Sequence, residues 1–156
     1  MTPPLPPGPY LPTSDLVAVA WLKSIGTLPA AGVATTLPSN AAAWADEGFV
    51  QAQTVTGIAD VDLPQWRRPL VQVDLWANAP DSNNPPWNKA ARLVELVRQG
   101  TEGPTGRVVT LPGDYLDARV LSVYLESEPR RVEDDPAGYA RFTLDLHVDW
   151  VRAHEA

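Results

Sequence analysis

The sequence contains no cysteine, and this absence excludes both disulfide bonds and thiolate metal ligands. It also lacks any apolar run near the roughly 20 residues that a membrane-spanning helix needs. The first residues lack the basic and apolar segments of a signal peptide. We therefore expect a soluble protein that is made in the cytoplasm and has no membrane partner.

Basic residues are scarce in the chain. Twelve Lys and Arg face 19 Asp and Glu, which gives a formal net charge of −7. Proteins that wrap nucleic acid neutralise its phosphates with cations, so this balance argues against broad phosphate binding. It leaves room for DNA that passes close to the protein without adhering to it.

Motifs for catalysis are missing as well: there is no Gly-rich phosphate loop, nucleophile elbow or metal-ligand set. The best candidate is Asp145, His147 and Asp149, which alternate on one expected strand face and could serve as a divalent metal or acid–base site. Adjacent same-face side chains on a strand lie ~6.5 to 7 Å apart, so three in a row converge poorly on an ion with bonds of ~2.1 Å. We interpret them as a solvated polar face, and we predict no enzyme activity, no metal and no cofactor.

The chain is instead rich in proline, with 17 in 156 residues, which is the length of one ordinary domain. Residues 1–12 carry six prolines and form a predicted N-terminal arm, extended and without a core of its own, ahead of a domain over residues 13–156. This arm is either disordered or laid along a neighbouring surface. Leu5, Tyr10 and Leu11 favour the second interpretation, because they are anchors that a plain linker would lack.

Two stretches have helical patterns. Thr13, Ser14 and Asp15 precede residues 16–25, which are apolar on nearly every side and end at Gly26. Such a helix is either central to the core or packed partly on another subunit. Residues 85–98 show a 3.6-residue period, with Gly100 at the expected end and an apolar stripe of Ala90, Leu93, Val94 and Val97. Residues 41–47 form one helical turn or a loop that carries Trp44.

Alternating patterns predict the strands. Residues 70–77 form a strand that leads into the second helix, so this helix is expected to pack on the sheet. Residues 139–151 form the last strand. Between them lie a strand over residues 118–127 and a charged loop over residues 128–138. Shorter strands are expected at residues 33–38, 49–57 and 107–111, and an acidic loop at residues 58–64. The apolar faces of the three long strands are Val71, Val73, Leu75 and Ala77, then Leu121, Val123 and Leu125, then Phe142, Leu144, Leu146, Val148 and Trp150.

Several of these segments, in this order, resemble the tail terminator proteins of long-tailed bacteriophages, particularly the version found in phages of actinobacteria. The resemblance covers most of the chain. It rests on short sequence segments in a given order and contains no invariant chemical motif. It is carried by the helix at residues 15–22, the edge segment at 33–38, the strand at 49–57, Arg68-Pro69-Leu70-Val71-Gln72-Val73-Asp74-Leu75-Trp76-Ala77 and Pro85-Pro86-Trp87-Asn88-Lys89-Ala90-Ala91.

The resemblance implies a single α+β domain, with a mostly antiparallel sheet flanked by two main helices behind the proline-rich arm. It further implies a homo-oligomeric ring, a hexamer, that caps the tail tube protein, ends tube polymerisation and presents a surface to the head-completion proteins. The ring would sit at the head-proximal end of the virion tail after assembly in the host cytoplasm. Genomic DNA would pass through its lumen without specific binding.

Large apolar and basic residues outside the expected core are candidates for the ring interfaces. They are Tyr10, Trp44, Val61, Leu63, Trp66, Arg67, Arg68, Arg130 and Arg131. Two alternatives stay open: another neck protein, such as a head-tail stopper or adaptor, and a small hydrolase or carbohydrate-binding domain that uses exposed tryptophans and loop carboxylates.

Overall fold

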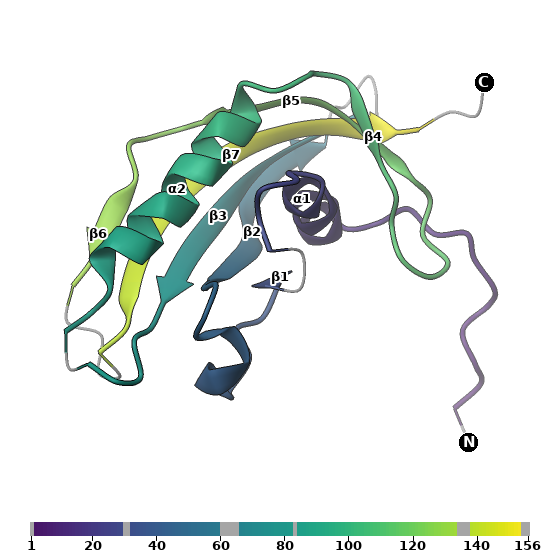
Figure 1. Cartoon of the computed structure of the whole chain (residues 1–156). Coiled ribbons are helices and arrows are strands. Elements are labelled where there is room, and N and C mark those ends of the chain that lie inside the picture. The colour runs from purple at the N-terminus through teal and green to yellow at the C-terminus, as the bar shows by residue number, and fades with distance from the viewer. Residues whose placement is uncertain (1, 30–31, 60–65, 83, 134–137, 154–156) are drawn as a thin grey trace.

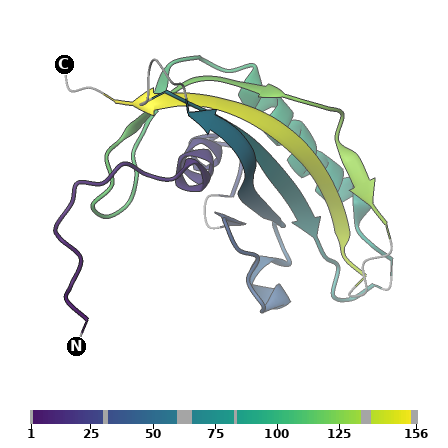
Figure 2. The ribbon, with the colours of Figure 1, turned by 180° about the vertical axis from the view of Figure 1, so that it is seen from behind.

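The computed structural model describes residues 2–29, 32–59, 66–82, 84–133 and 138–153. Within them, one curled β-sheet wraps around two α-helices to form a single α+β domain shaped like a half-barrel (Figures 1 and 2). This is the predicted fold class. The elements in chain order are α1 (Ser14–Lys23), β1 (Val33–Ala34), the 3-10 helix η2 (Ala41–Trp44), β2 (Phe49–Ala59), β3 (Arg67–Ala77), α2 (Trp87–Thr101), β4 (Arg107–Val109), β5 (Ala118–Leu125), β6 (Arg130–Val132) and β7 (Ala140–Arg152).

The strand order β1-β2-β3-β7-β5-β4 places the two long strands β3 and β7 at the centre of the sheet. The pairing of β1 with β2 is parallel, and the pairings of the other named strands are antiparallel. Strand β6 pairs with the part of β7 that β5 does not reach. Strand β2 runs two residues beyond the predicted end at residue 57, so residues 58 and 59 belong to it and not to the predicted acidic loop, while β1 and β4 are shorter than predicted.

The inner face of the sheet is the apolar face that the alternation predicts. In β3, the four predicted residues are fully buried, and in β7 the predicted face is buried except for Phe142, which is partly exposed. Val71 pairs with Leu146 and Val73 with Leu144, so the two apolar faces lie side by side. Each such side chain contributes about 1.5 to 3 kcal/mol on burial, which makes this pair of strands the centre of the core.

The apolar face predicted for residues 118–127 is partly wrong. In β5 the buried side chains are Ala118 and Val120, whereas Val123 and Leu125 pack against the core from the second half of the strand. The register with β7 shifts between Val120 and Ser122, which is a bulge at Leu121. The extra residue changes which side chains point inward, so Leu121 does not share the inner face with the other two.

The loop predicted over residues 128–138 contains a strand. Residues 130–132 form β6, whose Arg131 pairs with Phe142 of β7. Two arginines in three residues give no apolar alternation. The segment is therefore a strand because its backbone pairs with the exposed edge of β7. The local sequence alone does not predict this pairing.

Helix α1 is buried mainly through Val17, Ala18, Trp21 and Leu22. It begins at the predicted segment, but the polar residues there bond to distant strands and do not cap the helix. Ser14 Oγ accepts a hydrogen bond from Trp150 Nε1 at 3.0 Å, and Asp15 Oδ1 accepts one from the backbone N–H of Thr54. These bonds fasten the start of α1 to β7 and β2.

Helix α2 buries Ala90, Leu93 and Val97 of the predicted stripe, with Val94 partly buried against the core. The predicted end at Gly100 is wrong, because the helix continues to Thr101. A Cβ at Gly100 would overlap Ile25 Cδ1 and lie 2.9 Å from Ile25 Cγ1. Glycine therefore stands here because the segment that follows α1 packs closely on α2 at Ile25. In the described part of the chain, no helix combines the length and hydropathy needed to cross a bilayer.

Gly100→Ala should lower the stability of the fold by about 1 kcal/mol. Alanine inside a helix normally stabilises it by about 0.5 to 1 kcal/mol, but overpacking against Ile25 costs about 1 to 3 kcal/mol. Urea unfolding would measure the difference. Gly26→Ala is the matched control, because no atom lies within 4 Å of its added Cβ. A Gly100→Ala variant at least as stable as wild type would show that the contact is not tight.

Candidate assembly surfaces

Trp44, a predicted interface residue, lies inside the subunit. It is 4% exposed, and its ring meets Phe49 and Tyr139 at centroid distances of 6.5 and 5.1 Å. The aromatic cluster closes the end of the sheet beside η2. In the isolated chain the ring is therefore not available to a partner.

The other predicted interface residues lie at several places. Tyr10 is half-buried on the loop between β4 and β5, and Trp66 is half-buried below the Arg68 guanidinium, 4.2 Å from its ring centroid. Arg67 is half-buried at the start of β3. Val61 and Leu63 lie outside the described residues. Arg130 and Arg131 are exposed on β6, where the Arg131 guanidinium stacks 3.9 Å from the centroid of the Trp87 ring.

The outer face of the sheet carries a buried ion pair that the sequence analysis missed. Asp74 is 5% exposed and accepts a hydrogen bond from Arg141 Nη2 at 3.0 Å, and Gln72 Nε2 lies 3.2 Å from both of its carboxylate oxygens. The guanidinium also covers the Trp76 ring at 4.7 Å. The sequence signal for this pair is an aspartate at an outward position of β3 and an arginine at an outward position of β7.

A hollow of about 450 Å³ lies further along this outer face, lined by Thr56, Gly57, Arg68, Leu70, Tyr124, Glu126, His147 and Asp149. His147 stacks on Tyr124 at 4.8 Å and forms a hydrogen-bonded ion pair with Glu126. Asp149 accepts a hydrogen bond from Ser122 Oγ at 3.5 Å. The candidates His147 and Asp149 thus have different partners, and the candidate Asp145 does not line the hollow. Among the described residues, no three His, Asp or Glu side chains gather as metal ligands.

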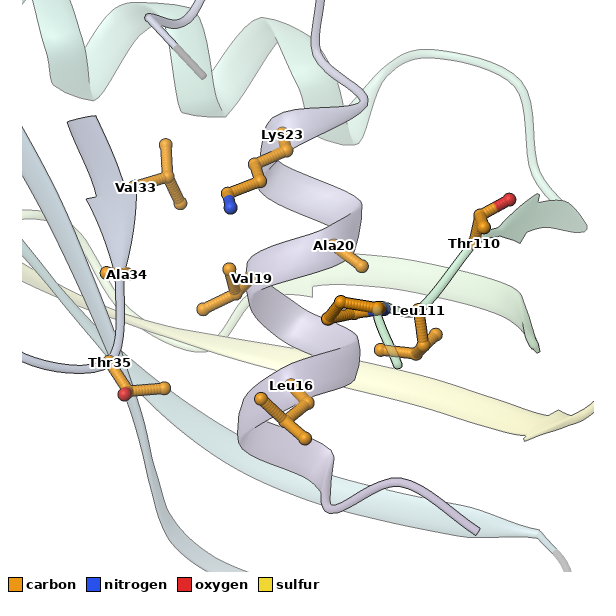
Figure 3. A pocket seen from close by; sticks show the side chains of 10 residues that line it. Leu16, Val19, Ala20, Lys23, Val33, Ala34, Thr35, Thr110 and Leu111 are labelled. Carbon is orange, nitrogen blue, oxygen red and sulfur yellow. The ribbon is translucent and has the colours of Figure 1, made fainter. Parts of the chain in front are cut away.

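A second hollow, of about 460 Å³, runs along α1 and is mostly apolar (Figure 3). One side of the helix forms it, through Leu16, Val19, Ala20 and Lys23. Strand β1 lies on one side of this helix face, and the segment at Thr110 and Leu111 lies on the other side. We call this hollow the α1 groove. The burial of α1 confirms the prediction of a helix central to the core, and packing of its groove side on another subunit stays a prediction.

The exposed side of α2 carries a local charge cluster. Arg98 bonds to Glu95 and Glu102, one turn away on each side, with N–O distances of 2.6 Å. The hydrogen bond from Arg98 lowers the pKa of Glu95 to about 2, and the same bonds raise the pKa of Arg98. Because both partners lie on one helix, the cluster supports that helix and offers no unpaired charge to a ligand.

Arg141→Met should destabilise the subunit by about 3 kcal/mol, because it leaves the Asp74 carboxylate buried without its cation. The double variant Asp74→Asn with Arg141→Met should recover most of that loss, since a neutral amide needs no counter-charge. Urea unfolding of the wild type, both single variants and the double variant measures the coupling. Losses that simply add would show that the pair is not coupled.

The fold can be compared with those of known proteins. No protein-family model matches the chain, and a search of curated proteins finds no match. Among solved structures, the chain is similar to a protein chain in a structure described as "Virion of native gene transfer agent (GTA) particle". The two chains share 15% sequence identity with a TM-score of 0.44 over 90% of each. Similarity at this level does not transfer a function.

Proposed function

We propose that this chain is a structural virion protein of a long-tailed phage or a phage-like particle. In this proposal, six copies form a ring that caps the tail tube, ends its polymerisation and joins the tail to the head-completion protein. The copy number and the position in the tail come from the sequence resemblance to tail terminators. The protein acts by binding other proteins and catalyses no reaction.

The observation that carries the proposal is that the sheet has two unlike open edges. At one edge, β1 pairs with only Val50 and Gln51 of β2, and residues 53–57 of β2 are exposed. At the opposite edge, β4 pairs with β5 only at residues 118–120. In the described part of the chain, no other strand covers either edge. Contacts between unlike surfaces run head to tail, and such contacts give a closed ring when the rotation between neighbours completes a full circle.

The charge of the chain also supports a conduit for DNA. A net charge of −7 repels phosphates, so a lumen made of these subunits would let DNA slide without holding it. The residues that line the outer-face hollow include two carboxylates, Glu126 and Asp149, beside one guanidinium, that of Arg68. This hollow therefore offers no concentrated positive patch that would bind a phosphate backbone.

Adding the purified protein to growing tail tubes tests the proposal. Rings should appear at one end of each tube in electron micrographs, and the capped tubes should not lengthen when more tube protein is added. Tubes incubated with bovine albumin are the control. Monomers alone in the presence of tubes, or tubes that keep growing, would overturn the proposal. Binding to a portal complex in preference to tube ends would favour the stopper or adaptor role.

Arg130→Glu should weaken docking to the adjoining neck or tube protein about tenfold and leave the melting temperature unchanged. Its guanidinium is exposed and contacts Ser127 Oγ at 3.5 Å, so its charge is available to a partner. Arg131→Glu is the comparison, because it also loses the stacking on Trp87 and should cost about 1 kcal/mol of stability. Unchanged tail joining by Arg130→Glu would remove β6 from the interface.

A further inference from the structure

The proline-rich arm consists of an anchored part and an exposed part. At Tyr10, the backbone N–H donates to Asp114 O at 2.7 Å, and the carbonyl accepts from Leu116 N–H at 2.8 Å. Gly8 lies so close that an added Cβ would be 2.7 Å from Asp114 Cβ. Residues 2–7 are all exposed, and they lead away from the sheet and the helices (Figures 1 and 2).

The exposed part has the chemistry of a docking segment. Leu5 lies at its centre and is 86% exposed, more than any other large apolar side chain in the described residues. In residues 2–7, Thr2 and Leu5 alone carry a backbone N–H, because the other four are prolines. The segment is therefore stiff, uncharged and rich in hydrogen-bond acceptors. Its stiffness reduces the entropy that is lost on binding.

The α1 groove has the complementary chemistry. Leu16, Val19 and Ala20 provide an apolar surface at the spacing i, i+3, i+4, which is how a helix presents one face to a partner. Lys23 and Thr35 at the same groove are donors that can meet carbonyl oxygens. In Figure 3 the Lys23 ammonium points from α1 towards Val33 of β1.

The lengths of the two features agree. Six residues in a polyproline conformation span about 19 Å, at about 3.1 Å per residue. The stripe from Leu16 to Lys23 spans about 10 Å, at about 1.5 Å per helical residue. The exposed part of the arm can therefore cover the groove and still bridge a gap of several ångströms between two subunits.

We propose that residues 2–7 of one subunit lie in the α1 groove of the adjacent subunit, with the Leu5 side chain against Val19 and Ala20. The occupant is thus a second copy of this chain, because the anchor at Tyr10 and Asp114 directs the arm away from its own body. This docking rests on the proposed ring and names the contact that links neighbouring subunits.

Crosslinking tests the docking directly, because the chain has no cysteine of its own. The double variant Leu5→Cys with Ala20→Cys, assembled on tube ends and treated with a short thiol crosslinker, should give a ladder of linked subunits on denaturing gels. Leu5→Cys with Tyr124→Cys is the matched control, because Tyr124 is exposed on the outer face of the sheet. Its ladder should be at least tenfold weaker.

The possible results separate the two proposals. Rings that form normally while both double variants crosslink equally poorly would overturn the docking and leave the ring intact. A crosslink that forms only within one chain would also overturn it. Monomers under all conditions would overturn both.

A second variant guards against effects of the cysteines. Leu5→Asp changes an exposed side chain, so the subunit should fold with an unchanged melting temperature. It should raise the protein concentration needed for half-maximal ring formation at least tenfold, because the carboxylate would lose water against the apolar side chains of Val19 and Ala20. Pro3→Ala, which keeps Leu5, should raise that concentration by less than threefold. Equal assembly by Leu5→Asp and the wild type would contradict the proposal.

Discussion

The antiparallel pairing of β3 with β7 is the interaction on which the other elements depend. It joins two strands whose fully buried apolar residues point to one side, so this side must be covered. The helices α1 and α2 supply the cover, and Ile25, just after α1, packs so closely on α2 that Gly100 has room for no side chain.

The two central strands could be predicted from the sequence because both are long and alternate strictly. Elements whose structure depends on a distant partner could not. The residues of β6 are extended because the edge of β7 lies beside them, and their own pattern of Arg130, Arg131 and Val132 shows no strand signal. The bulge at Leu121 likewise changes the inward-facing side chains of β5 without any irregularity in the spacing of its apolar residues.

The candidate surfaces also depend on distant partners that the local sequence does not show. A tryptophan in a sequence indicates a large buried contact, but it does not say whether the contact lies within the chain or between chains. The Trp44 ring packs against Tyr139 inside the subunit, and only the fold brings these two residues together. Leu5 has no such partner in the described residues, and the apolar side of α1 at Val19 lines a groove that no described segment fills. The sequence signal for this groove was that the first helix is apolar on nearly every side.

Assembly of an acidic subunit needs contacts that do not depend on charge. Copies that each carry −7 repel one another, and the repulsion acts over about 10 Å at 0.1 M salt. An uncharged, proline-stiffened arm that places Leu5 against an apolar helix face adds attraction at close range without adding charge. In the proposed ring, the contacts between neighbours would then be apolar and local, while the charge that remains on the subunit surfaces would keep a passing DNA from adhering. The same need for contacts that do not depend on charge explains why the exposed arm contains no acidic or basic side chain in residues 2–7.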